Sequence, residues 1–192
     1  MIKQITLWLL VIALGIGCGL CAALMLTRTQ YFGNLRVNHG PWSVAGENTI
    51  TDDPLMVARL AVFGPFPVKQ SEVMYLTALQ DSEGRPLRAD KNYSVCGKKF
   101  DARFWSLTAY DQNGMFFPNQ DQRFSYNFKT VKFDGDQFCL QTGPLRQPEN
   151  WLPTQGNGGM RLTIRFYQPS QFLRDSLSAQ VLPTIKMIGV AQ

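Results

Sequence analysis

The first part of the chain differs sharply from the rest in its pattern of hydrophobic positions. From Ile5 to Leu26 the sequence reads ITLWLLVIALGIGCGLCAALML, with no acidic or basic side chain. An α-helix rises about 1.5 Å per residue, so this run is long enough to cross the roughly 30 Å hydrocarbon core of a bilayer. Residues 5–26 are therefore predicted to be a transmembrane helix or uncleaved signal anchor. Residues 1–4 would be a cytoplasmic leader, and the rest of the chain would be exported.

Two other interpretations of the apolar run remain open. A cleaved signal peptide shares its pattern, although this run is longer than a usual signal core and residues 22–27 offer no clear small-x-small cleavage site. Cys18 and Cys21 raise a lipoprotein as the third interpretation, but neither follows the leucine and small-residue pattern that lipidation needs. Lys3 and Arg28 flank the run on its two sides, so charge alone does not fix its orientation.

Residues 27–46 are polar and contain several glycines, which is typical of a stalk, and the exported domain is expected over residues 47–192. One helix is predicted near its start. Asp53 is a suitable N-cap, Pro54 suits the first helical position, and Gly64 can end the helix.

Beyond this helix the pattern changes to short extended runs separated by turn residues. The runs are 73–79, 92–97, 104–110, 124–128, a hairpin of 130–133 with 137–142, and 161–167. In the last run Leu162, Ile164 and Phe166 are expected to face inward, and Arg161 and Arg165 outward. Seven or so strands without intervening helical periods predict an all-β domain, an antiparallel β-sandwich or jelly roll with one or two short helices.

Composition and charge narrow the classes of function. Hydrophobic residues make up 45% of the chain and charged residues 17%, which is enough for a packed core and argues against disorder. The net charge of +5 is spread along the chain among acidic residues. A nucleic-acid-binding protein is expected to concentrate its positive charge, so nucleic acid is not an expected partner.

Two cysteines, Cys96 and Cys139, lie in the exported part. In an oxidising compartment they are candidates for a disulfide, and two buried free thiols are the alternative. No Cys-x-x-Cys occurs in this part and the chain has a single histidine, so neither a metal site nor a cofactor is predicted.

The residues needed for the common hydrolytic mechanisms are sparse. His39, the only histidine, lies in the predicted stalk, so a serine or cysteine nucleophile would lack a histidine base. Carboxylates that could hydrolyse a glycoside are present, but most open or flank turns, as Asp111 does. We expect a non-catalytic domain, with a carbohydrate-active hydrolase or lyase that uses carboxylates and tyrosines as the alternative.

Aromatic and arginine side chains form the most informative group. Aromatic rings stack on sugars, and arginine forks hold carboxylates or phosphates. The group consists of Trp105, Tyr110, Arg123, Tyr126, Trp151, Arg161, Arg165 and Tyr167. Trp105 shares a strand face with Leu107 and is expected in the core, and the outward arginines are most simply solvated. The ligand-binding candidates are Tyr110, Asp111, Arg123, Tyr126, Asn150 and Trp151.

Several segments resemble the bacterial family known as domain of unknown function 1214. They are FWSLTAYD (104–111), Asn119, RFS (123–125), NWLP (150–153), LTIRFYQP (162–169), Asp53-Pro54 with the helix after it, 81–87, and LPTI (182–185). The resemblance covers roughly residues 42–189 and implies a β-sandwich of jelly-roll type, here in a stand-alone, membrane-anchored form. Phe104 stands where the family often has tryptophan, and Asn119-Gln120 replaces a frequent Asn-Pro.

The resemblance implies no activity. Together, the observations predict a single-pass protein of the bacterial inner membrane whose soluble domain lies in the periplasm. That domain is expected to bind an envelope glycan, a lipid headgroup or a protein partner. A purely structural domain within an assembly is a further alternative.

Overall fold

The computed structural model describes residues 2–28, 36–45, 71–177 and 182–188. They fall into two units: the amino-terminal helix belongs to one, and residues 36–45, 71–177 and 182–188 belong to the other. The helix predicted from Asp53 lies outside the described residues.

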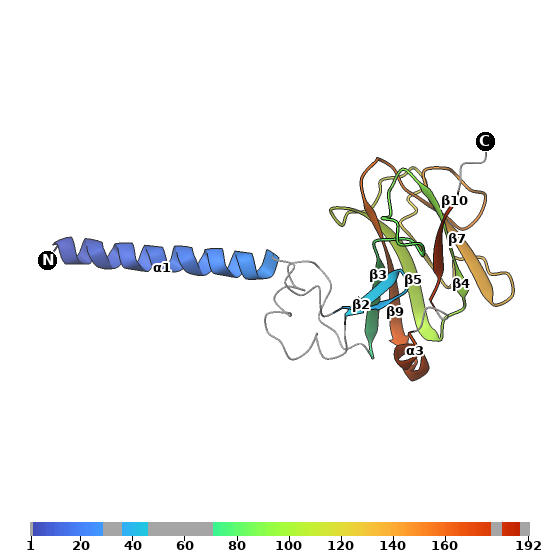
Figure 1. Cartoon of the computed structure of the whole chain (residues 1–192), viewed down its shortest axis with the longest axis horizontal. Helices are drawn as coiled ribbons and strands as arrows, with labels where there is room; N and C mark the ends of the chain where they lie inside the picture. Colours follow the sequence, from blue (N-terminus) through green and yellow to red (C-terminus); the bar gives the residue numbers. More distant parts are fainter. Residues whose placement is uncertain (1, 29–35, 46–70, 178–181, 189–192) are drawn as a thin grey trace. The chain divides into compact units, whose positions relative to one another are not determined.

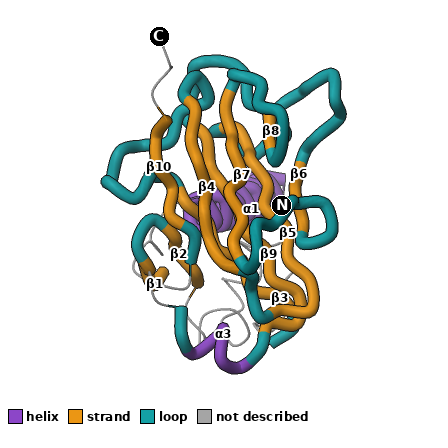
Figure 2. The backbone as a smooth tube through the Cα atoms, turned by 90° about the vertical axis from the view of Figure 1, so that its right-hand side faces the viewer, coloured by secondary structure: helices purple, strands orange, loops and turns teal. Residues whose placement is uncertain are grey.

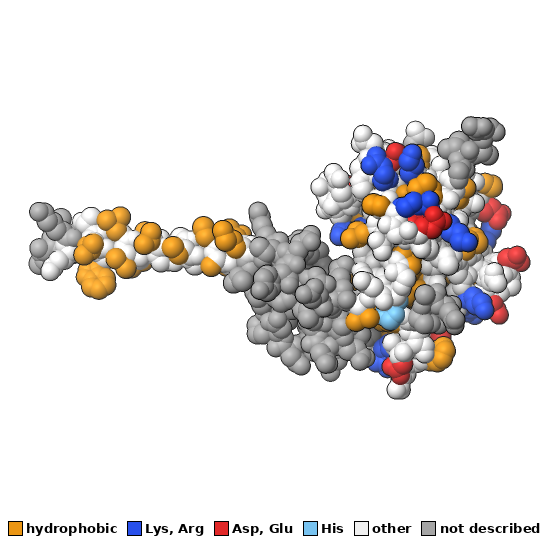
Figure 3. Space-filling model, viewed as in Figure 1, with side chains coloured by type: hydrophobic (Ala, Val, Ile, Leu, Met, Phe, Trp, Pro, Cys, Tyr) orange, Lys and Arg blue, Asp and Glu red, His pale blue; other side chains and the backbone are white. Residues whose placement is uncertain are grey.

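The amino-terminal unit contains α1, Ile2–Arg28. Its segment Gln4–Met25 is long and apolar enough to cross a membrane, and none of it is buried. Figure 3 shows apolar side chains along the length of this helix. For Trp8, Leu14 and Met25 the exposed fraction is 67%, 71% and 68%. A helix that is apolar on all sides and has no protein around it fits a lipid environment, and a signal sequence has the same properties.

The second unit is mostly β, with two sheets (Figures 1 and 2). The six-stranded sheet has the order β1-β2-β3-β9-β5-β6, and the four-stranded sheet has the order β10-β4-β7-β8. The strands of the first sheet are β1 (Arg36–His39), β2 (Trp42–Ala45), β3 (Val73–Ala78), β5 (Ala102–Asp111), β6 (Ser125–Asn127) and β9 (Met160–Pro169). Those of the second are β4 (Asn92–Lys98), β7 (Gln137–Gly143), β8 (Trp151–Pro153) and β10 (Thr184–Ile188), and a short helix, α3 (Gln171–Asp175), follows β9.

The two sheets share one hydrophobic core. Trp105 of β5 stacks on Phe138 of β7 with ring centroids 5.1 Å apart, and Phe100 packs edge-on against Trp105 at the same distance. Leu107 and Ile164 pair across β5 and β9, and both are fully buried. The predicted inward faces of β5 and β9 are thus confirmed, including the core position of Trp105.

Two side-chain hydrogen bonds join the sheets at opposite sides of the domain. The indole Nε1 of Trp42, in β2, donates to the carbonyl of Pro183, just before β10, at 2.7 Å. The backbone N–H of Trp151, in β8, donates to the hydroxyl of Tyr126, in β6, at 3.1 Å.

The structure corrects four details of the sequence prediction. Residues 36–45 of the expected stalk form β1 and β2 and extend the six-stranded sheet, because β2 pairs with β3. The pairing of β7 with β8 is parallel, so the second sheet is mixed rather than antiparallel. Residues 130–133 form no strand, and the predicted hairpin shrinks to one isolated bridge between Asp134 and Gln137. Asn150-Trp151-Leu152-Pro153, which lies outside the predicted strands, includes strand β8.

A disulfide joins Cys96 and Cys139, which lie directly opposite each other in β4 and β7 with their Cα atoms 4.1 Å apart. It closes a loop across a sequence separation of 43 residues, which on the chain-entropy model stabilises the fold by about 4 kcal/mol.

Candidate binding site

The outer face of the six-stranded sheet carries polar and aromatic side chains across its three central strands. Because side chains alternate along a strand, the residues between the core positions of β3, β9 and β5 all point to this side. Tyr75 lies opposite Arg165, and Arg161 lies opposite Tyr110. Tyr167 follows two positions after Arg165 on the same face. We call these five residues the arginine–tyrosine strip.

Arg165 lies at the centre of the strip and is half-buried. Its Nη1 donates to Thr108 Oγ1 at 3.2 Å, and its Nη2 donates a short hydrogen bond to the Tyr110 hydroxyl. The guanidinium carbon lies 5.8 Å from the ring centroid of Tyr75 and 5.4 Å from that of Tyr110. The guanidinium is therefore held between two rings and hydrogen-bonded to two neutral hydroxyls.

Arg161, also part of the strip, packs against the ring of Tyr110. Its guanidinium carbon is 5.5 Å from the Tyr110 ring centroid, and the Tyr110 ring also stacks on Phe116, with centroids 5.1 Å apart. Gly114 makes room for this arrangement. A Cβ there would lie 2.4 Å from Arg161 Nη2, and the glycine has a φ of +83°, which other residues rarely adopt.

The charge of the strip is not balanced by carboxylates. Among the described residues, none of the ion pairs involves Arg161 or Arg165. Burial raises the pKa of Tyr75 above its ordinary value, and Tyr167 adds to this effect while Arg165 opposes it. Tyr75 therefore stays protonated at neutral pH and keeps its hydroxyl proton as a hydrogen-bond donor.

A groove opens at the end of the strip next to Gln168, where β9 ends. Its volume is about 730 Å³, and it is lined by Glu72, Arg103, Phe104, Phe128, Lys129, Tyr167 and Gln168. The Phe104 ring contacts Phe128 and Tyr167 edge-on, with centroid distances of 5.4 and 5.5 Å. Arg103 Nη1 donates to Gln168 Oε1 at 2.8 Å. We call this the β9-end groove. It shares Tyr167 with the strip.

A second groove lies at the opposite end of the strip, among the loops after β5 and before β9. Its volume is about 400 Å³, and its lining residues include Asp111, Gln112, Asn113 and Gln155, together with Phe116 and a glycine-rich turn, 156–159. We call it the amide-lined groove. Asp111, a predicted candidate, is engaged in its own turn, because its Oδ1 accepts hydrogen bonds from the backbone N–H groups of Asn113 at 2.9 Å and Met115 at 2.7 Å.

Four of the six predicted candidates lie together elsewhere, at the edges of β6 and β8. Asn150 is buried, with a φ of +45°. Its side chain accepts from the N–H of Lys132 and donates to the carbonyls of Lys132 and Cys139. Trp151 Nε1 donates to the carbonyl of Gly143 at 3.0 Å. The protein itself therefore satisfies these polar groups.

Tyr126 and Arg123 complete this edge cluster. Tyr126 is 8% exposed, and its hydroxyl accepts from the Trp151 N–H. The Arg123 guanidinium carbon lies 4.9 Å from the Tyr126 ring centroid. Arg123 takes part in none of the ion pairs found among the described residues.

Of the predicted candidates, the strip includes Tyr110, while Asp111 lies beside it in the amide-lined groove. Arg161, Arg165 and Tyr167 were recognised in the aromatic and basic group, but the arginines were interpreted as solvated. Tyr75 is not among the predicted candidates, although residues 73–79 are predicted as a strand. Its place between the buried Met74 and Leu76 is the signal that marks it as outward-facing.

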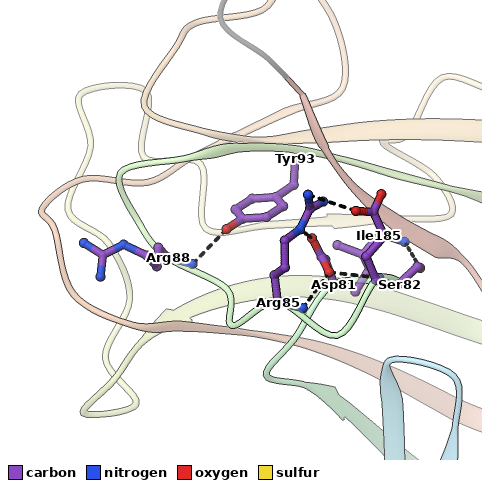
Figure 4. Close-up of polar contacts among 7 residues, drawn as sticks. Asp81, Ser82, Arg85, Arg88, Tyr93 and Ile185 are labelled. Carbon is purple, nitrogen blue, oxygen red and sulfur yellow. Dashed lines mark hydrogen bonds and ion pairs between the residues drawn. The ribbon is translucent and has the colours of Figure 1, made fainter.

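Asp81 is the most strongly buried carboxylate of the described residues, and such a group is a candidate for function. Its Oδ1 accepts from the backbone N–H groups of Glu83 and Arg85, each at 2.9 Å, and its Oδ2 accepts from Arg85 Nε at 2.7 Å (Figure 4). Burial opposes ionisation, but the hydrogen bonds and charge of Arg85 and the N–H of Glu83 outweigh it. The pKa of Asp81 therefore lies below its ordinary value.

The turn that begins at Asp81 is hydrogen-bonded to β10. The backbone N–H of Ser82 donates to the carbonyl of Ile185 at 2.8 Å, and the Ile185 N–H donates to Ser82 Oγ at 2.9 Å (Figure 4). Further along, the N–H of Arg88 donates to the hydroxyl of the fully buried Tyr93 at 3.0 Å. Asp81 thus holds a structural turn, and its oxygens are already used.

Residues 72–171 match the family model described as protein of unknown function (DUF1214). The chain belongs to this family. All five residues of the arginine–tyrosine strip lie within the matched segment of the DUF1214 member. No curated protein matches the sequence significantly.

One solved structure supports the fold. The VPA0106 protein from Vibrio parahaemolyticus aligns with a TM-score of 0.59 and 22% sequence identity, over 76% of this chain and 38% of that protein. An uncharacterized protein from Burkholderia cenocepacia aligns with a TM-score of 0.45 and 16% identity, over 87% of this chain and 40% of that protein. The DUF1214 member therefore spans well under half the length of either protein, and the Vibrio protein is similar to it in fold.

Proposed function

We propose that this DUF1214 member is a membrane-tethered binding protein whose two-sheet domain lies in the periplasm and holds a component of the cell envelope on the arginine–tyrosine strip. The observation that carries the proposal is the state of Arg165. Its guanidinium has lost part of its hydration, and its hydrogen-bond partners among the described residues are the neutral Thr108 and Tyr110. An anionic group would complete such a site, because charge-assisted bonds to an arginine fork are roughly twice as strong as neutral ones.

The tether and the compartment are supported by separate observations. Helix α1 is apolar over Gln4–Met25 and exposed on all sides. The disulfide between Cys96 and Cys139 fits an oxidising compartment. Both a retained anchor and a cleaved signal would export the domain, and we favour the anchor because the run is longer than a signal core requires.

Binding rather than catalysis is favoured by the grooves at the two ends of the strip. Among the described residues that line them, each groove has one carboxylate, Glu72 in the β9-end groove and Asp111 in the amide-lined groove. Hydrolysis of a glycoside requires a pair of carboxylates across the scissile bond. The jelly-roll form of the two-sheet domain remains our interpretation of its fold.

Compartment and tether can be tested directly. Alkaline phosphatase fused after Gln192 should be active, because it needs an oxidising compartment, whereas β-galactosidase at the same place should be inactive. The fusion should stay in the membrane at the full length of the chain. A product shortened by about the length of α1 would show a cleaved signal, and active β-galactosidase would contradict export.

Binding can be tested on the full-length protein in nanodiscs of zwitterionic lipid. Thermal unfolding is followed by tryptophan fluorescence with envelope polysaccharides, peptidoglycan fragments and anionic lipid headgroups. A ligand at a hundred times its dissociation constant adds about 2.7 kcal/mol to the free energy of unfolding, which raises the melting temperature by several degrees. The shift should occur in wild type, disappear in Arg165→Gln, and persist in Lys186→Gln, which removes one charge from the exposed side of β10.

A shift of equal size in wild type and Arg165→Gln would contradict the assignment of the site. No shift with any envelope fraction would contradict the binding function itself.

A further inference from the structure

We infer that the arginine–tyrosine strip and its two end grooves bind an extended polysaccharide strand whose sugars carry carboxylates. This inference rests on the proposed function and names the class of its ligand.

The site has the shape of a track rather than of a closed pocket. Along β9 the outward side chains run from Tyr167 through Arg165 to Arg161, which spans roughly 20 Å at the usual rise of a strand. The β9-end groove begins at Tyr167, and the amide-lined groove contains Phe116, which stacks on Tyr110. The track is therefore open at both ends, and a polymer that continues past the domain can lie along it.

Aromatic rings are placed at intervals along this track. Tyr167 is 37% exposed and Phe116 is 50% exposed, and they lie toward opposite ends. Between them, the half-buried rings of Tyr75 and Tyr110 contact Arg165. Flat ring faces pack against the C–H faces of sugars, and tyrosine hydroxyls hydrogen-bond to sugar hydroxyls. The presence of several rings along the track favours a chain of sugars over a polymer that offers only charged groups.

The charges along the same track are mainly positive. Arg161 and Arg165 have no carboxylate partner among the described residues, and the β9-end groove adds Arg103 and Lys129 against Glu72. A planar guanidinium matches a carboxylate in a two-bond arrangement. Positive groups between aromatic rings therefore fit sugar acids, in which a carboxylate is attached to each ring.

The amide-lined groove suits the hydroxyl groups of such a strand. Gln112, Asn113 and Gln155 bring both donors and acceptors to its walls. Sugar hydroxyls also act as donors and acceptors. This end of the track therefore provides mainly hydrogen bonds, and its one carboxylate among the described residues, Asp111, already accepts hydrogen bonds from the backbone N–H groups of Asn113 and Met115.

A matched pair of oligosaccharides tests the inference. Hexamannuronate and mannohexaose share ring geometry and linkage and differ in a carboxylate against a hydroxymethyl group. Their binding to full-length protein in zwitterionic nanodiscs is measured by calorimetry, with mannuronate monomer and a hexathymidine oligonucleotide alongside. Hexamannuronate should bind at least about tenfold more tightly than either mannohexaose or the monomer, because only it offers both charge and length.

Single substitutions test whether hexamannuronate binds on the arginine–tyrosine strip. Arg165→Gln should weaken hexamannuronate binding about tenfold or more, Arg165→Lys should weaken it less, and Lys186→Gln should change it less than about twofold. Each variant is first checked for an unchanged melting temperature without ligand. If Arg165→Gln fails to fold, Arg161→Gln serves in its place and should also weaken binding.

The possible outcomes distinguish failure of the inferred ligand class from failure of the proposed binding function. Equal binding of mannohexaose, or tighter binding of the oligonucleotide, would overturn the acidic polysaccharide and leave Arg165-dependent binding intact. Binding of hexamannuronate that is insensitive to both arginine variants would overturn the placement on the strip. No binding of any oligosaccharide, together with no response to the envelope fractions described above, would overturn both the inference and the proposed function.

Discussion

Replacing Asp81 by alanine should cost the domain about 3–4 kcal/mol of unfolding free energy. The buried carboxylate accepts two backbone hydrogen bonds, from Glu83 and Arg85, and each bond to a charged group contributes about 1.5 kcal/mol at the low end of its range. The ion pair with Arg85 adds less than about 1 kcal/mol, because that side chain is 44% exposed and its charge is screened by solvent. Urea unfolding of the full-length protein, followed by tryptophan fluorescence, measures the loss.

Two comparisons make this prediction sharper. Arg88→Ala, in the same loop, should cost less than about 1 kcal/mol because its ion pair with Asp90 is exposed. Asp81→Asn should lie between wild type and alanine, because the amide oxygen still accepts a hydrogen bond but carries no charge. A loss below about 1 kcal/mol in Asp81→Ala would refute the reasoning, since the two backbone N–H groups would then need no acceptor.

The same residue predicts a pH dependence. The pKa of Asp81 is lower in the folded than in the unfolded protein, where it is near 3.8. A group whose pKa falls on folding stabilises the fold above its unfolded pKa and loses that effect as the pH falls through its folded pKa. The stability difference between wild type and Asp81→Asn should stay constant from pH 5 to 8 and shrink below about pH 4. A difference unchanged at pH 2.5 would show that the charge of Asp81 contributes nothing.

Three further changes probe other parts of the domain. Cys139→Ser should lower the unfolding free energy by about 4 kcal/mol by opening the disulfide loop, and reductant should then have no further effect on the melting temperature. Tyr126→Phe should cost about 1–3 kcal/mol, because the partly buried backbone N–H of Trp151 loses its acceptor; a neutral result in urea unfolding would mean that water replaces the hydroxyl. Gly114→Ala should lower the free energy of unfolding by about 1 kcal/mol because of the positive φ, and it should displace the Arg161 side chain. The loss of binding free energy should therefore exceed the loss of unfolding free energy. Unaltered binding would show that Arg161 does not contact the ligand.

The interior of the two sheets could be predicted from the sequence because alternation is strong in the long strands. Trp105, Leu107 and Ala109 mark the inner face of β5, and Leu162, Ile164 and Phe166 mark that of β9. The short strands could not be predicted in the same way. Four residues in β1 or β2, and three in β8, give too few positions for a period of two to stand out.

The candidate site was harder to predict than the core, because its position depends on register between strands far apart in sequence. Arg165 and Tyr75 are brought together only when β9 pairs with β3, and no local pattern encodes that pairing. Trp151 and Asn150 are among the ligand-binding candidates predicted from the sequence. In the structure their side chains instead donate hydrogen bonds to carbonyls of β7, which is a structural role.

The outermost strands of both sheets are short, and this has a consequence for how copies of the protein behave beside one another. β1 has four residues, β6 and β8 have three each, and β10 has five with the exposed Lys186 among them. Copies tethered to one membrane would meet at high effective concentration, where a long open edge invites strands of neighbouring molecules to add on. Short edges and an edge lysine offer few sites for such addition. Short edge strands therefore limit aggregation between copies, while the longer central strands carry the face on which we propose that a ligand binds.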